Sequence, residues 1–338
     1  MLPAVRDQSG NTLIEMSTVR PAAPDVEQQD IDEARAFNAQ LEALIATQPL
    51  VYTVPPEVTR KARREGKGIF PAPVFLEEAR DIAIAGRSGP IKVRLIRPDR
   101  RPTGIYLHIH GGGWTLGGHD MQDVALKQLA NETGLAAASI NYRLAPENPY
   151  PAGPDDCEDA VLHLLEHGPA LLDAPARFAI GGESAGAHLA VVTLLRLRDR
   201  HGITNRIAAA NLAYGAYDMT GTPSQVLWGD RNLVLSTPIV IWFGNNFLPG
   251  TAMEQRRDPD ISPLYARLHD MPPALFTVGT MDCLIDDSLF MAERWRVAGN
   301  LAEIAVYPEG VHGFNAYPTA LARKANARQF EFLRSSLT

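Results

Sequence analysis

The sequence predicts an α/β protein whose mostly parallel sheet is covered by helices on both faces. From about residue 79, short apolar runs alternate with amphipathic stretches of helical length, which is typical of strands alternating with helices. Runs such as 135–140 are almost entirely apolar, as expected for a strand with both faces buried. These two observations together favour a sheet with crossover helices on either side.

The N-terminal segment, residues 1–75, has a different pattern. Apolar residues recur at helical spacing from Ile31 to Ile45, with Asp30 positioned to cap this helix and Pro49 to end it. A second short helix is expected over 55–66. Helices with one apolar stripe and no partner of their own must pack on another part of the chain. We therefore expect this segment to form a cap over a catalytic domain at 76–338.

The elements of residues 76–338 follow in order. Eight strands are expected, at 81–85, 91–97, 104–110, 135–140, 177–181, 207–214, 274–279 and 303–307, the first two joined by a turn at 87–90. Helices are expected at 121–132, 156–166, 185–200, about 285–298 and 319–335. The alternation stops between about 216 and 256, where aromatic residues gather (Trp228, Trp242 and Phe243 among them) and a helix begins near 236–238. We interpret this insert as a second part of the cap.

Composition excludes several classes of function. The formal net charge of −7 offers no basic face for a nucleic acid, and the basic cluster at 60–64 is interpreted as a solvated helix face. Two cysteines, Cys157 and Cys283, are too few for a disulfide framework. The N-terminus lacks the pattern of a secretion signal, and no apolar run is long enough to span a bilayer. A cytoplasmic enzyme is expected.

The run 182–186 (Gly-Glu-Ser-Ala-Gly) indicates a nucleophile. A G-x-S-x-G pattern between a strand and a helix is typical of the sharp turn that exposes a serine hydroxyl, here that of Ser184. The following helix N-terminus would lie beside developing negative charge. Taken alone, this run is equally compatible with a plain glycine-rich turn.

A second glycine run supports the catalytic interpretation. Residues 110–114 (His-Gly-Gly-Gly-Trp) follow the strand at 104–110, and glycines allow backbone amides to approach a substrate oxygen closely. We expect the N–H groups of Gly112, Gly113 and Ala185 to form an oxyanion hole. A phosphate-binding loop is disfavoured because its motif spacings are missing. His110 is expected to orient this loop.

The general base and its acid partner should follow Ser184, each on a loop after a strand. Among the later histidines, His312 lies just past the final predicted strand, in what we expect to be a flexible loop. The acid has two candidates, Asp282 after the strand at 274–279 and Asp218 after the strand at 207–214. The first is preferred because its strand should neighbour the one before His312. Asp286 and Asp287 are expected to cap or line the next helix.

Together these motifs resemble the hormone-sensitive-lipase branch of the α/β-hydrolases. The resemblance covers roughly residues 75–338 and rests on motifs at 110–114, 141–147, 182–186, 262–264, 282–284 and 311–314, all in the order found in that family. It implies an eight-stranded sheet, a two-part cap, and carboxylesterase activity on short- to medium-chain acyl esters. It also implies a small-molecule ester substrate, with no cofactor and no metal.

The sequence departs from the family pattern at three places: Asn141 replaces the usual Asp, Cys283 the usual Pro, and Ala187-His188 the usual Gly-Asn. With Ala187-His188 after the serine, the sequence resembles kynurenine formamidases at this place, so an amidase or formamidase remains an alternative. A non-catalytic ligand-binding protein resembling the gibberellin receptors is a further alternative, although those lack a working histidine. The natural substrate and possible homodimerisation stay open.

Overall fold

The computed structural model describes residues 25–337, which are built around one eight-stranded sheet. The strand order is β1-β2-β4-β3-β5-β6-β7-β8, and β2 is antiparallel to both of its neighbours while all other pairs are parallel. The predicted fold class is confirmed. The strands are β1 (Arg80–Gly86), β2 (Gly89–Ile96), β3 (Gly104–Ile109), β4 (Leu135–Asn141), β5 (Phe178–Glu183), β6 (Ile207–Ala213), β7 (Ala274–Met281) and β8 (Ala302–Val311).

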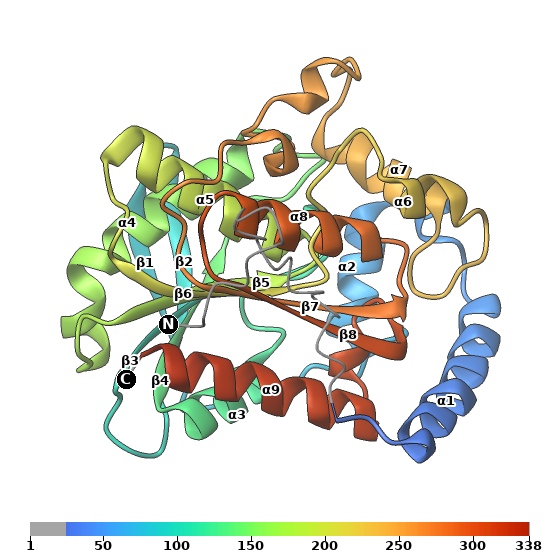
Figure 1. The fold of residues 1–338 in the computed structure, drawn as a ribbon, viewed down its shortest axis with the longest axis horizontal. Helices are drawn as coiled ribbons and strands as arrows, with labels where there is room; N and C mark the ends of the chain where they lie inside the picture. The colour runs from blue at the N-terminus through green and yellow to red at the C-terminus, as the bar shows by residue number, and fades with distance from the viewer. Residues whose placement is uncertain (1–24, 338) are drawn as a thin grey trace, which may run out of the picture.

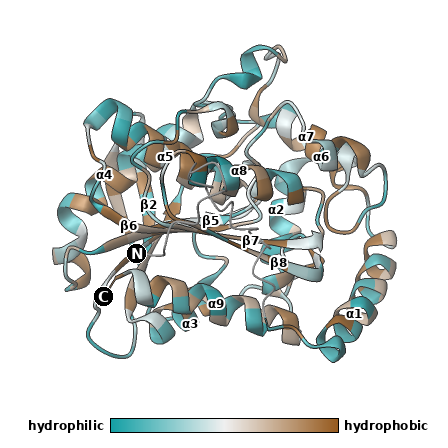
Figure 2. Ribbon diagram, viewed as in Figure 1, coloured by the Kyte–Doolittle hydropathy of each residue, from teal (hydrophilic) through white to brown (hydrophobic). Residues whose placement is uncertain are grey.

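Helices cover both faces of this sheet (Figure 1). One layer contains α4 (Ala152–Leu172), α5 (Ala185–His201) and α8 (Ile285–Val297), and the other contains α3 (Asp123–Thr133) and α9 (Ala320–Ser336). The strands consist mostly of hydrophobic or neutral residues, whereas the helices alternate between hydrophobic and hydrophilic residues along their length (Figure 2). All six residues of β3 are buried, as expected for a central strand covered on both sides.

Helix α4 and strand β8 extend well beyond their predicted bounds, and both contain prolines. Helix α4 begins at Ala152, and its Pro154 lies in the first turn, where a missing N–H costs no helical hydrogen bond. Strand β8 continues through Pro308 to Val311. As the outermost strand, β8 tolerates a residue that cannot donate to a neighbour. His312 lies just past the final strand, as predicted, but residues 308–311 belong to that strand and not to the expected loop.

The N-terminal helices lie at the end of the sheet where β7 and β8 finish (Figure 1). The N-cap of helix α1 (Gln28–Ala46) is Glu27, three residues before the predicted cap Asp30. Asp30 instead accepts a hydrogen bond from the Glu27 N–H at 2.8 Å. Helix α2 (Pro56–Arg64) confirms the second predicted helix. Residues 1–24 of the expected cap segment, and the N-terminus that lacks a signal pattern, fall outside the described residues.

The insert after β6 contains the short helix α6 (Pro223–Leu227), which the sequence did not predict, and α7 (Thr237–Phe247), which it did. It is anchored to the body of the protein by Asp287 on α8, which is fully buried. This carboxylate accepts hydrogen bonds from the backbone N–H groups of Tyr217 and Asp218 at 2.6 and 3.0 Å. Thr222 Oγ1 and Gln225 Nε2 donate to its other oxygen.

We expect Asp287→Ala to lower the free energy of unfolding by about 3–5 kcal/mol, because several buried donors lose their acceptor at once. Urea unfolding followed by circular dichroism measures this. Asp286→Ala is the matched control: Asp286 is only partly buried and accepts one backbone N–H, that of Ser224, at 2.7 Å. Equal losses in the two variants would show that Asp287 does not anchor the insert.

None of the helices within residues 25–337 combines the length and apolarity needed to cross a membrane.

Candidate active site

Ser184 occupies a sharp turn between β5 and α5. Its φ of 55° lies in the left-handed region, where non-glycine residues are rare and strained. The turn presses the chain against β3: a Cβ on Gly182 or on Gly186 would come within 2.1 or 1.9 Å of the Ile109 carbonyl oxygen. Only glycine fits at these two positions. The glycines at 182 and 186 therefore allow the close approach to β3 that this turn requires.

A chain of hydrogen bonds joins Ser184 to His312 and Asp282. His312 Nε2 lies 2.9 Å from Ser184 Oγ, and His312 Nδ1 lies 2.8 Å from Asp282 Oδ2. Asp282 directly follows β7 and is almost completely buried, with a relative exposure of 1%. Its other oxygen accepts a hydrogen bond from the Leu284 N–H at 2.9 Å, which fixes the orientation of the carboxylate. The three residues identified from sequence thus meet at the carboxyl end of the sheet.

The second candidate, Asp218, and the acidic residues near Asp282 and His312 along the chain are engaged elsewhere. Asp218 accepts hydrogen bonds from the backbone N–H and hydroxyl of Thr220 and from the Tyr265 hydroxyl, and none from His312. Asp286 and Asp287 bind the insert described above. Glu309 forms an ion pair with Arg35 at 2.9 Å. Asp282 is therefore the carboxylate that contacts His312.

The glycine loop after β3 borders the same site. Gly112 and Gly113 have φ values of 118° and 58°, and both line the pocket that contains Ser184. Within residues 25–337, the N–H groups of Gly112, Gly113 and Ala185 donate to no other protein group. These three amides are free to bind a substrate oxygen.

His110 and His188 are buried structural residues. His110 Nδ1 donates to the Gly111 carbonyl at 2.8 Å, and its ring stacks on Tyr142. Burial lowers the pKa of His110 and of His188 to about 4, so both are neutral at pH 7. His188 Nδ1 accepts a hydrogen bond from Trp114, and its Nε2 donates to the Ile261 carbonyl. The Ala187-His188 departure therefore adds no group to the chemistry beside Ser184.

We expect Gly112→Ala to reduce kcat by about 10²–10³, the typical cost of losing one oxyanion donor. A Cβ at this position would lie 2.2 Å from the Leu116 carbonyl oxygen, so the loop must shift. Steady-state kinetics measures the loss, and circular dichroism verifies that the variant is folded. Gly202→Ala is the control, since it also has a positive φ but no atom near its Cβ. A Gly112→Ala variant with wild-type kcat would contradict the assigned role.

Two supporting contacts were not predicted from the sequence. Tyr214, at the end of β6, packs edge-on against the His312 ring with centroids 4.8 Å apart, and it limits how that ring can rotate. Arg60 on α2 donates to the carbonyls of Thr115 and Ala145 at 2.8 and 2.7 Å and pairs with Glu147. This arginine fastens α2 to the glycine loop. Neither contact has a sequence motif, because both join segments far apart along the chain.

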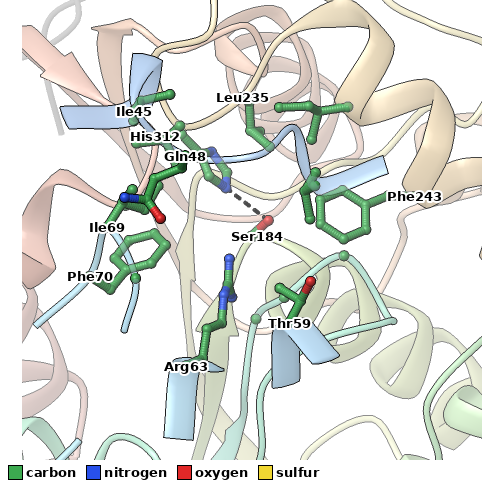
Figure 3. A pocket seen from close by; sticks show the side chains of 18 of the residues that line it. Ile45, Gln48, Thr59, Arg63, Ile69, Phe70, Ser184, Leu235, Phe243 and His312 are labelled. Carbon is green, nitrogen blue, oxygen red and sulfur yellow. Dashed lines mark hydrogen bonds between the residues drawn. The ribbon is translucent and has the colours of Figure 1, made fainter. Parts of the chain in front are cut away.

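The pocket above Ser184 has a volume of about 330 Å³. It is walled by α2 and the following loop on one side and by the insert on the other (Figure 3). Phe243 lines it, whereas Trp228 and Trp242 do not.

Among residues 25–337, no group of three or more His, Cys, Asp or Glu side chains is placed to hold a metal ion.

The fold and the position of Ser184 define an α/β-hydrolase. A family model described as alpha/beta hydrolase fold matches residues 106–316. Carboxylic ester hydrolase LipN of Mycobacterium tuberculosis is 33% identical over 251 residues, which cover 72% of this chain and 66% of LipN. Carboxylesterase NlhH of the same species is 30% identical over 330 residues, covering 90% of this chain and 95% of NlhH.

Solved structures agree with these relatives. An esterase from the archaeon Pyrobaculum calidifontis superposes with a TM-score of 0.80 at 28% identity, over 89% of this chain and 97% of that chain. The chain therefore belongs to the hormone-sensitive-lipase-like branch of the α/β-hydrolases, a family of ester hydrolases.

Proposed function

We propose that the chain is a serine carboxylesterase that cleaves short- to medium-chain acyl esters through an acyl-enzyme on Ser184. The observation that carries this proposal is the hydrogen-bonded series Ser184–His312–Asp282. It opens into a pocket where three backbone amides have no acceptor within residues 25–337. Relatives named carboxylesterase, acetyl esterase and ethyl acetate hydrolase support the same reaction.

In the proposed mechanism, Ser184 Oγ attacks the ester carbonyl while His312 Nε2 takes the hydroxyl proton. Asp282 accepts the Nδ1–H of His312 and stabilises the imidazolium that forms. The carbonyl oxygen becomes negative and is bound by the free amides of the glycine loop and Ala185. His312 then donates its proton to the leaving alkoxide, and the acyl group stays on Ser184.

Deacylation repeats these steps with water. His312 takes a proton from the water molecule as it attacks the acyl carbon, and the same amides bind the oxyanion. Collapse of the second tetrahedral intermediate breaks the bond to Ser184, which regains its proton from His312. The carboxylic acid leaves, and the enzyme returns to its starting state.

We propose further that the N-terminal helices and the 216–256 insert act as a two-part cap that limits acyl length. Support comes from the pocket lining, which combines residues of α1, α2 and α7 with Ser184 and His312. A cavity of about 330 Å³ is at the small end of ligand pockets, which favours short acyl chains.

A rate panel of p-nitrophenyl esters from acetyl to palmitoyl tests this function. We expect kcat/KM to be highest for acyl chains of up to about eight carbons, because pockets of this size bury only a small ligand. Matched butyryl esters and butyramides, together with a formamide substrate, separate esterase from amidase activity. Faster amide or formamide cleavage, or a maximum at palmitoyl, would contradict the proposal.

A further inference from the structure

The basic cluster on α2 is not a uniformly solvated face, contrary to the expectation from sequence. Arg60 pairs with Glu147 at 2.8 Å, Arg64 with Asp120 at 2.9 Å, and Lys61 with Glu65 at 3.8 Å. These three side chains have carboxylate partners. The fourth member of the cluster, Arg63, forms no ion pair or hydrogen bond with any residue in the described part of the chain.

Arg63 points into the pocket toward Ser184 (Figure 3). Thr59, Ala62 and Arg63 all line the pocket, as expected for residues three and four apart on one face of a helix. The guanidinium carbon lies 5.3 Å from the centroid of the Phe70 ring, and Phe70 in turn stacks on Tyr317. An aromatic ring below a guanidinium holds it in place and leaves its N–H groups available to an anion.

Among residues 25–337, no carboxylate pairs with Arg63. Arg63 is only partly exposed, and burial lowers the pKa of its guanidinium below the usual value. Glu183 borders the same pocket, but its carboxylate contacts His108 at 3.2 Å and accepts from Gln122 at 3.3 Å. A desolvated cation without an anion is costly, and a bound carboxylate would offset that cost.

We propose that Arg63 binds a carboxylate on the substrate, so that the preferred substrates are monoanionic esters. The anion is a single carboxylate because, among the described residues, the pocket lining contains only one unpaired arginine or lysine. Lys67, the other such residue in the lining, pairs with Glu65 at 2.8 Å and is 73% exposed. A guanidinium fork matches the two oxygens of a carboxylate. This inference rests on the ester hydrolysis proposed above.

Two pairs of esters test the proposal, each with one neutral and one anionic member. The acyl-side pair is p-nitrophenyl hexanoate and mono-p-nitrophenyl adipate; the alcohol-side pair is p-tolyl butyrate and the butyrate ester of 4-hydroxyphenylacetic acid. For each pair, the measured quantity is kcat/KM of the anionic ester divided by kcat/KM of the neutral ester. We expect Arg63→Gln to lower this ratio by about 10- to 100-fold in one of the two pairs, the range for a charged hydrogen-bonded pair. Most of the loss should appear in KM, since the carboxylate lies away from the reacting carbonyl.

Two further variants sharpen the comparison. Arg63→Lys keeps the charge but not the fork, so its ratio should lie between those of wild type and Arg63→Gln. Lys61→Gln removes a positive charge from the same helix at a side chain that is 79% exposed, and it should keep the wild-type ratio. Circular dichroism verifies that all three variants are folded.

Binding without turnover gives an independent readout. The Ser184→Ala variant and the Ser184→Ala/Arg63→Gln double variant are titrated calorimetrically with the two anionic esters, mono-p-nitrophenyl adipate and the butyrate ester of 4-hydroxyphenylacetic acid. The double variant should bind at least one of these esters about 10-fold or more weakly. Unchanged ratios in both pairs would overturn the inference while leaving the esterase proposal intact. Equal losses for neutral and anionic esters would also overturn it, since Arg63 would then act on the reacting carbonyl. If wild type cleaved none of the four esters, the proposed function itself would fail.

Discussion

Ser184→Ala is expected to lower kcat for a good ester substrate by about four to six orders of magnitude, the scale of nucleophile removal in serine hydrolases. The reason is chemical: without Oγ there is no acyl-enzyme, and His312 has no hydroxyl proton to accept. KM should change little, because the pocket walls and the free amides remain. Steady-state and single-turnover kinetics on p-nitrophenyl butyrate measure both quantities.

Ser88→Ala is a suitable control for this loss, since Ser88 lies exposed in the turn between β1 and β2. It should retain wild-type kcat. A Ser184→Ala variant with more than a few per cent of wild-type kcat would mean that another group attacks the ester. The roles given to His312 and the glycine loop would then need a different nucleophile.

Asp282→Asn should reduce kcat by about four orders of magnitude, as expected when the partner of a catalytic histidine becomes an amide. Asp282 Oδ2 contacts His312 Nδ1 at 2.8 Å, and an amide NH₂ at this position would favour the wrong tautomer of the imidazole. Ser184 would then face an N–H instead of a lone pair. The variant should still fold, because the amide oxygen can accept from the Leu284 N–H.

Asp218→Asn is the matched control for the acid. Asp218 is also buried and also follows a strand of the sheet, but its hydrogen bonds go to Thr220 and Tyr265. Its loss in kcat should be small beside that of Asp282→Asn. The reverse order of effects would transfer the role of the orienting acid to Asp218.

The parts of the fold that follow local rules were predictable. The strand and helix alternation predicted the parallel sheet, and the Ser184 turn could be located because its glycines are required by contacts with β3. The positions of Asp282 and His312 followed from the rule that the carboxyl ends of parallel strands meet at one edge. Each of these conclusions depends on residues close in sequence or on strand order.

The details that escaped prediction depend on long-range contacts. Helix α4 and strand β8 extend past their predicted bounds, and their Pro154 and Pro308 are tolerated because one lies in a first helical turn and the other at a sheet edge. The cluster at 60–64 looks like one charged face, yet tertiary contacts pair Arg60 with Glu147 and Arg64 with Asp120 and leave Arg63 without an ion pair in the described part of the chain. Arg63 could be singled out only once the pairing of its neighbours was visible.

Covalent labelling tests the central claim most directly. Wild-type protein treated with a fluorophosphonate should gain the mass of one phosphonyl group, and tandem mass spectrometry of its peptides should locate that group on Ser184. Labelling should be lost in Ser184→Ala and strongly slowed in Asp282→Asn. A wild-type protein that takes up no label, or that carries it on another residue, would contradict the account.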